Sequence, residues 1–267
     1  VPAHVWTPHF SLFGANSGFD SIEECFGDQT EKIYAIETGL SSDPKMNWRW
    51  SALDRLSLTS NSDSHSPSKI GREANVFKER FGYKELIEIL KTKDKNKFLY
   101  TVEFYPEEGK YHWDGHRKCH ARLSPKESRD LNYRCPTCGR KATVGVMQRV
   151  EKLSDRDEGF VLENAPGFKN MVPLIEIIAE ALSVGAESVS VKREYNKLLD
   201  KLGTEFEILL EMPEKQLEDS CLPKIARGII NARTGNVCVL PGYDGQYGKV
   251  EMLKGALETK EKQMELF

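Results

Sequence analysis

Long hydrophobic runs are missing from this chain of 267 residues. No apolar stretch approaches the roughly 18 residues that cross a membrane, so we expect no membrane partner. The first residues also lack the basic and apolar regions of a signal peptide. Hydrophobic residues nevertheless make up 39% of the chain and charged residues 30%, which is ordinary for a soluble protein. The length is sufficient for a buried core and for one to three modest domains.

Cysteine is sparse, with six residues in the whole chain. This number excludes a disulfide scaffold and favours a reducing cytoplasm, where we expect the protein to be located. Cys25, Cys221 and Cys238 stand in apolar or helical contexts without metal-ligand spacing, which predicts structural thiols. The other three cysteines are clustered and have a different interpretation.

The chain also lacks a nucleotide-binding P-loop and an internal repeat. The stretch 241–248 contains three glycines but no Gly-Lys-Ser/Thr. Its backbone could approach DNA phosphates closely, and a tight turn between two strands explains it nearly as well. A general excess of positive charge is missing too, because the net charge is −3. This value by itself argues against a general binder of polyanions.

The charge is unevenly distributed. Residues 109–150 contain ten lysines and arginines against three acidic residues, a local charge of +7. Such a basic segment in acidic surroundings is typical of contact with a phosphate backbone. The alternative is that residues 109–150 are basic only because a small module needs charge to stay soluble, and this explains the charge less well. The residues that we expect to contact DNA are Lys118, Arg122, Arg134, Arg140 and Lys141.

The fold class predicted from the sequence is α/β. In residues 1–108, strands at 32–37, 56–61 and 98–104 alternate with helices at 21–26, 47–55 and 83–91, which favours a mainly parallel sheet with its site at the carboxyl ends of the strands. Residues 151–257 are mostly helical. The helices there are expected from Pro173 to Gly185, over 187–202 and over 214–233, with strands at 205–211 and 237–240. Residues 258–267 form a charged tail.

The strongest chemical signal lies in residues 109–150. His116 and Cys119 are separated by two residues, and so are Cys135 and Cys138, with fifteen residues between the two pairs. Two such knuckles can close a tetrahedral site, which predicts a structural zinc ion. The free energy of zinc binding, roughly 10–16 kcal/mol in comparable peptides, would hold together a segment with few apolar residues. His112 and His120 are rivals for the fourth ligand.

A second group of candidate metal ligands lies near the strand ends. Asp63 and His65 follow the strand at 56–61, and His4 ends another short run of small residues. An Asp-x-His pair at a strand end can place both side chains in the mouth of a barrel or open sheet. The pair alone is more often a solvated turn. Glu37 ends its strand on the same side, and it either orients a ligand or accepts a hydrogen bond from a loop.

Several stretches spread along the chain resemble the endonuclease Q group of the PHP family of metal-dependent phosphoesterases. The matching stretches are Pro2-Ala3-His4, Glu37-Thr38-Gly39-Leu40-Ser41, Ser60 to Pro67, Gly71-Arg72-Glu73, Gly109-Lys110-Tyr111-His112, the cysteine cluster, and Pro241 to Gly248. The family barrel begins with a His-x-His strand that this sequence does not contain. The resemblance therefore implies the C-terminal two-thirds of a longer bacterial enzyme, inactive without the N-terminal part of the barrel. Family members tend to have cysteine at the position of His116.

The resemblance also implies an activity. The family hydrolyses the phosphodiester 5′ to a deaminated base (uracil, hypoxanthine or xanthine) or to an abasic site, without removing the base. His4, Asp63 and His65 would then bind two or three catalytic metals. Carboxylate and imidazole ligands suit Zn²⁺, Mn²⁺ or Fe²⁺, with Mg²⁺ binding less well. The expected architecture is the C-terminal part of a distorted PHP-type barrel over 1–108, a zinc ribbon over 109–150, and a mostly helical α+β domain.

Two other functions compete with this interpretation. A small-molecule phosphatase of the PHP type explains the metal ligands but leaves the basic segment unused, and a non-catalytic adapter would bind only DNA and a partner protein. That partner is suggested by the end of the chain. Gln263, Met264, Leu266 and Phe267 are similar to the peptide by which bacterial proteins bind the DNA sliding clamp, where two apolar side chains enter a hydrophobic pocket.

Overall fold

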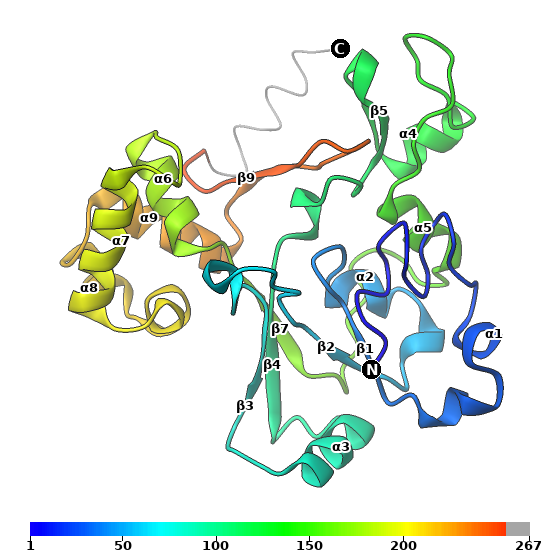
Figure 1. Ribbon diagram of the computed structural model, residues 1–267, viewed down its shortest axis with the longest axis horizontal. Coiled ribbons are helices and arrows are strands. Elements are labelled where there is room, and N and C mark those ends of the chain that lie inside the picture. The colour runs from blue at the N-terminus through cyan, green and yellow to red at the C-terminus, as the bar shows by residue number, and fades with distance from the viewer. Residues whose placement is uncertain (255–267) are drawn as a thin grey trace. The chain divides into compact units, whose positions relative to one another are not determined.

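The computed structural model describes residues 1–254 and contains two compact units (Figure 1). The first unit comprises residues 1–169 and 240–249, and the second begins at Asn170 and, within the described residues, comprises 170–239 and 250–254. The tail peptide predicted at 263–267 lies outside the described residues. No helix in residues 1–254 is long and apolar enough to cross a membrane.

The first unit contains short strands and helices. Its elements are α1 (Ile22–Phe26), β1 (Ala35–Glu37), α2 (Pro44–Trp48), β2 (Ser57–Thr59), β3 (Ala74–Phe77), α3 (Tyr83–Thr92), β4 (Phe98–Glu103), β5 (Asp114–His116), β6 (Ala121–Leu123), α4 (Pro125–Asp130), α5 (Val146–Leu153) and β7 (Gly167–Asn170). Strand β7 ends at the start of the second unit. Two strands near the C-terminus, β8 (Cys238–Leu240) and β9 (Lys249–Glu251), pair with each other.

The strands of residues 1–108 form two small sheets. Strands β1 and β2 pair in parallel, whereas β3 and β4 pair antiparallel within the three-stranded sheet β3-β4-β7. The prediction of a mainly parallel sheet is therefore wrong. Phe77 at the end of β3 pairs with Phe98 at the start of β4, so the intervening α3 turns the chain back at one end of the strands instead of crossing the sheet (Figure 1).

Local capping explains where the helices begin. The helix expected over 21–26 is present as α1, and it begins one residue later because the Ser21 hydroxyl accepts the Glu24 N–H as its cap. The helix expected over 47–55 instead begins at Pro44, because the Asp43 side chain accepts the Met46 N–H (2.9 Å) and proline suits the first helical position. A separate single turn follows at Ser51–Leu53.

The main core of the first unit lies between its N-terminal segment, β1, α2 and α5. Trp6, Phe13 and Trp50 pack with ring centroids 5.0–6.2 Å apart, and Val146 and Val150 of α5 are buried against the same cluster. Helix α5 thus joins the segment predicted as a ribbon to the core of residues 1–108. Its Arg149 is buried and bonded to the Phe13 and Phe19 carbonyls, so it does not contribute to an exposed basic surface.

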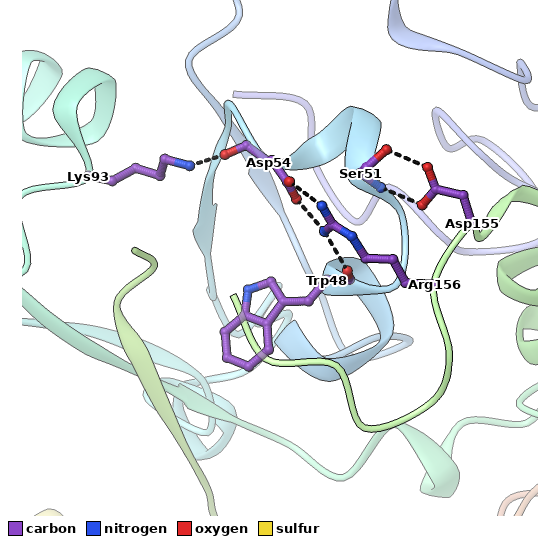
Figure 2. Close-up of polar contacts among 6 residues, drawn as sticks. All are labelled: Trp48, Ser51, Asp54, Lys93, Asp155 and Arg156. Carbon is purple, nitrogen blue, oxygen red and sulfur yellow. Dashed lines mark hydrogen bonds and ion pairs between the residues drawn. The ribbon is translucent and has the colours of Figure 1, made fainter. Parts of the chain in front are cut away.

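The segment that follows α5 is fixed to the α2 region by polar contacts (Figure 2). Arg156 donates two hydrogen bonds to the Asp54 carboxylate, at 2.7 and 2.5 Å, and a third to the Trp48 carbonyl at 3.1 Å. Asp155 accepts hydrogen bonds from the backbone and hydroxyl of Ser51. The Lys93 ammonium reaches the Asp54 carbonyl from the other side. These contacts connect three segments distant in sequence.

The second unit is mostly helical. It contains α6 (Leu174–Leu182), α7 (Val189–Leu202), a π-helical turn (Glu207–Glu211), α8 (Glu214–Glu218) and α9 (Pro223–Thr234). Leu174, Ile177, Leu198, Ile225 and Ile229 are each no more than 1% exposed and form its core.

Two predictions in this unit are wrong. The strand expected over 205–211 is helical, because Thr204 and Glu207 cap each other's backbone N–H groups and start a turn. The single helix expected over 214–233 is two helices, since Pro223 opens α9 at its first position.

Candidate metal and nucleic-acid sites

The cysteine cluster closes as the spacing predicts. The ligand atoms of His116, Cys119, Cys135 and Cys138 all lie within 4.8 Å of one another. His116 comes from β5, and β5 and β6 form a hairpin around Cys119. Neither of the rival histidines, His112 and His120, belongs to the group. His112 is buried, and burial lowers its pKa to about 4. Three thiols and an imidazole at these distances are a donor set that fits zinc.

The local electrostatics also favour a metal ligand at Cys135. Burial of Cys135 would by itself raise the pKa of its thiol, but the backbone N–H groups of Cys138 and Thr137, together with the side chains of Cys138 and His116, lower that pKa to about 6. A thiolate is the form of cysteine that binds metal ions. The group has four protein ligands and no open position, which suits a structural site better than a catalytic one.

The predicted DNA-contacting residues differ in their surroundings. Lys118, Arg134, Arg140 and Lys141 are exposed, in keeping with a role at a surface. Arg122 is half-buried, and its guanidinium lies 5.1 Å from the centroid of the Tyr243 ring. We therefore expect substitution of Arg122 to disturb packing as well as charge.

Among residues 1–254, the cysteine cluster is the sole group of three or more His, Cys, Asp or Glu side chains positioned to hold a metal ion. His4, Asp63 and His65 are not gathered into a second group of this kind. Asp63 and His65 are exposed, and the His65 Nδ1 atom lies 2.9 Å from the Asp63 carbonyl. The His4 Nδ1 atom, in contrast, is buried and has no hydrogen-bond partner. A buried ring nitrogen without a protein partner is suited to binding a metal ion.

The surroundings of His4 are built from the strand ends. Glu37, at the end of β1, accepts the His4 backbone N–H at 2.8 Å with one carboxylate oxygen and the Asn61 side-chain amide at 2.8 Å with the other. Glu37 therefore ties His4 to the strand end that leads to Asp63. His4 and Asp63 both have positive φ, 33° and 44°. Such backbone strain in residues other than glycine is concentrated at functional sites.

Gly39 makes this arrangement of His4 sterically feasible. Its φ is +62°, and a Cβ atom placed on it would lie 2.8 Å from the His4 Cβ. Any side chain at position 39 would displace His4.

Buried acids that the sequence did not single out lie beside this region. Glu73 and Glu103 are 3% and 0% exposed. Burial raises the pKa of Glu103 to about 8 and that of Glu73 well above its ordinary value, with mutual repulsion adding to the shift of Glu73. Glu103 ends β4 as Glu37 ends β1. An acidic residue at the end of an otherwise apolar strand is the signal that would have found it.

Comparison with known proteins gives a consistent relationship. A family profile described as the MJ0043 C-terminal domain matches residues 173–236. The chain is 32% identical over 252 residues to the uncharacterized protein MJ0043 of Methanocaldococcus jannaschii, covering 92% of this chain and 31% of that protein. It is 33% identical over 253 residues to the uncharacterized protein YqxK of Bacillus subtilis, covering 94% and 60%.

Solved structures carry the decisive similarity. The lesion-specific endonuclease PfuEndoQ from Pyrococcus furiosus superposes with a TM-score of 0.83 and 30% identity, over 98% of this chain and 65% of that one. In fold and sequence, the chain is therefore similar to endonuclease Q. An endonuclease Q complex with a 27-mer duplex bearing an abasic lesion at the active site gives a TM-score of 0.80, with 30% identity over 97% of this chain and 65% of that chain. The chain spans less than two thirds of the length of each of these four relatives.

Proposed function

We propose that this chain is part of a DNA-repair endonuclease that hydrolyses the phosphodiester 5′ to deaminated bases or abasic sites. The observation that carries the proposal is the fold similarity to a lesion-specific endonuclease over 98% of the chain. The complex of a second endonuclease Q structure with an abasic duplex supports DNA as the partner. Extrusion of the lesion from the helix is least costly where base pairing is already weak, which suits both kinds of lesion.

The proposed catalytic residues are His4, Asp63 and His65, which would bind divalent metal in the C-terminal part of a PHP-type barrel. The buried, unpartnered Nδ1 atom of His4 supports this assignment. When bound, such metals lower the pKa of water and neutralise the phosphodiester. These three side chains are not gathered around one point, so the proposal assigns them to different ions of a cluster of two or three metals.

Other residues of the chain position these ligands. Glu37 holds the backbone of His4 and the amide of Asn61, and so keeps the ends of β1 and β2 together. Asn75 of β3 adds a hydrogen bond to the Asn61 side chain at 3.0 Å and another to the Ser60 carbonyl at 2.8 Å. We infer that Glu37 is a positioning residue, because both of its oxygens are already occupied by protein donors.

The remaining assignments follow from charge and sequence. We propose that His116, Cys119, Cys135 and Cys138 hold a structural Zn²⁺, and that Lys118, Arg134, Arg140 and Lys141 contact DNA phosphates. Each such contact that is neutralised should lower the slope of log binding constant against log salt by about one. The peptide at 263–267 remains a proposed ligand for a sliding clamp, tested by loss of clamp binding when these five residues are removed.

The decisive experiment is strand cleavage. An end-labelled duplex with a single abasic site or deoxyuridine is incubated with a form of the protein that extends across the full family length, and with Mn²⁺ or Zn²⁺. We expect a nick 5′ to the lesion, lost in Asp63→Asn and retained in the matched surface control Asp130→Asn. Cleavage that is equal on undamaged DNA, or unaffected by Asp63→Asn, would contradict the proposal. The 267-residue chain alone is expected to bind this duplex without cutting it.

A further inference from the structure

The loop between β8 and β9, residues 241–248, presents a rigid surface that neither the proposed catalytic ligands nor the cysteine cluster explains. The loop lies beside β5 (Figure 1) and is bonded to residues 107–113. Gly242 N–H donates to the Glu107 carbonyl at 2.8 Å, and Gly248 N–H donates to the Glu108 carbonyl at 3.0 Å. The Trp113 N–H in turn donates to Gly242 at 2.9 Å.

Close backbone packing explains the glycines of this loop. A Cβ atom on Gly242 would lie 2.3 Å from the Gly109 carbonyl oxygen, and one on Gly248 would lie 2.1 Å from that of Glu107. The loop is therefore a packed turn. The N–H groups of Gly242, Tyr243, Gly245, Gln246 and Gly248 are bonded to protein carbonyls, so these groups do not form a phosphate cradle. What the loop offers to a partner is its side chains, held in a fixed position.

The two tyrosines of the loop have different environments. Tyr243 is 5% exposed and packs under the Arg122 guanidinium. Tyr247 is 74% exposed. Packing within the protein therefore accounts for Tyr243 but leaves one face or edge of the Tyr247 ring without a protein partner.

One basic group lies against the exposed ring and a second lies against the same loop. The Lys110 ammonium lies 5.2 Å from the centroid of the Tyr247 ring, within the range of a cation–π contact. The Arg117 guanidinium lies against the same loop, with its Nη1 atom 3.7 Å from the position of a Cβ atom on Gly245. Both basic residues are exposed.

The acid of the loop is already engaged. Asp244 accepts the Arg117 backbone N–H at 2.6 Å and the Thr143 hydroxyl at 2.6 Å. Since Arg117 lies between the ligands His116 and Cys119, this bond also attaches the loop to the metal-binding hairpin. The Asp244 carboxylate is thus occupied by protein donors. The Lys110 cation remains at the surface beside the Tyr247 ring, and the exposed Arg117 cation lies near Gly245 of the same loop.

We propose that Tyr247, Lys110 and Arg117 form a stacking surface for an unpaired base of damaged DNA, with the two cations on the flanking phosphates. An exposed aromatic ring beside cations is the arrangement that binds single-stranded nucleic acid, because every base has a face on which a ring can stack. In an intact duplex these faces are covered by neighbouring bases. The inference rests on the proposed function, since an abasic or extruded lesion is what supplies the unpaired base.

Fluorescence anisotropy with the 267-residue chain tests the stacking surface without requiring cleavage. Three labelled DNAs are compared: a single strand, an intact duplex, and the same duplex with one abasic site. We expect Tyr247→Ala to weaken binding of the single strand and the abasic duplex roughly 5- to 100-fold, with little effect on the intact duplex. Tyr247→Phe should retain binding, and Lys110→Gln should lower the salt slope by about one.

Tyr83→Ala is the matched control, because Tyr83 is 79% exposed at the start of α3 and lies in the same unit. Unchanged binding by Tyr247→Ala, or an equal loss on all three DNAs, would overturn the stacking surface. If wild-type protein still prefers the abasic duplex in that case, the proposed function stands. If the wild-type chain shows no preference for the abasic duplex, both proposals fail.

Discussion

Replacement of Glu103 by glutamine tests whether a buried acid beside the proposed catalytic region is protonated in the folded protein. Glu103 is fully buried. The Thr38 hydroxyl has one hydrogen but two acceptors in reach, a Glu103 oxygen at 2.9 Å and the Thr59 carbonyl at 3.1 Å. A protonated Glu103 satisfies both contacts, because it donates to the Thr38 hydroxyl, which then donates to Thr59. Glutamine can donate in the same way.

The expected effect follows from the two pKa values. Burial raises the pKa of Glu103 from 4.5 to about 8, although the Thr101 and Thr38 hydroxyls lower it. As the pH rises, Glu103 therefore loses its proton at a lower pH in the unfolded chain than in the folded protein. The stabilising contribution of Glu103 is fully present below pH 4.5 and is lost as the pH rises to 8. At 1.36 kcal/mol per pH unit, the loss between pH 5 and pH 8 is about 3 to 4 kcal/mol, because the slope is reduced near each of the two pKa values.

Tryptophan fluorescence during urea unfolding measures this change in the unit that contains Glu103. All four tryptophans lie in the first unit, at positions 6, 48, 50 and 113. Because glutamine does not titrate, we expect the stability of Glu103→Gln relative to wild type to increase steadily from pH 5 to pH 8. Glu88→Gln, at a side chain that is 64% exposed, is the control and should track wild type. Parallel pH profiles for Glu103→Gln and wild type would show that the folded protein holds Glu103 ionised and would refute the reasoning.

Three further predictions concern the site, the metal and the fold. Gly39→Ala should abolish lesion cleavage by displacing His4, whereas Gly82→Ala, which has open space and an ordinary φ of −80°, should leave cleavage intact; equal activities would contradict the steric argument. Cys135→Ser should lower bound zinc, measured by metal analysis after gel filtration, from one per chain to a small fraction, and an unchanged content would exclude the site. Arg156→Ala should lower the free energy of unfolding by about 1 kcal/mol, because a partly exposed bidentate ion pair is lost; Arg156→Lys should fall between, and no change in urea midpoint would show that the pair contributes nothing.

Features encoded within a few residues could be predicted from the sequence. The short helix after Asp20, helix α3, the helices on either side of residue 185 and the two cysteine knuckles all depend on neighbours in the chain. The spacing of the knuckles predicted a four-ligand group, and the structure places its ligand atoms within 4.8 Å and selects His116 over the rivals His112 and His120. Where the prediction failed locally, as at 205–211, a competing cap between Thr204 and Glu207 was overlooked.

Other features depended on contacts between distant segments, and these only the tertiary structure decided. The sequence could not show that β3 and β4 run antiparallel, because the direction of pairing depends on the end of the strand at which α3 packs. Arg149 and Arg140 have the same charge in the sequence. In the structure, Arg149 is buried against a carbonyl 130 residues away, whereas Arg140 is exposed. Charge, helix or strand propensity and residue spacing can be read from the sequence, whereas the burial of a side chain depends on which distant segments pack against it. The protonation expected of Glu103 and the exposure of Tyr247 both follow from burial, so neither could be predicted from residue type alone.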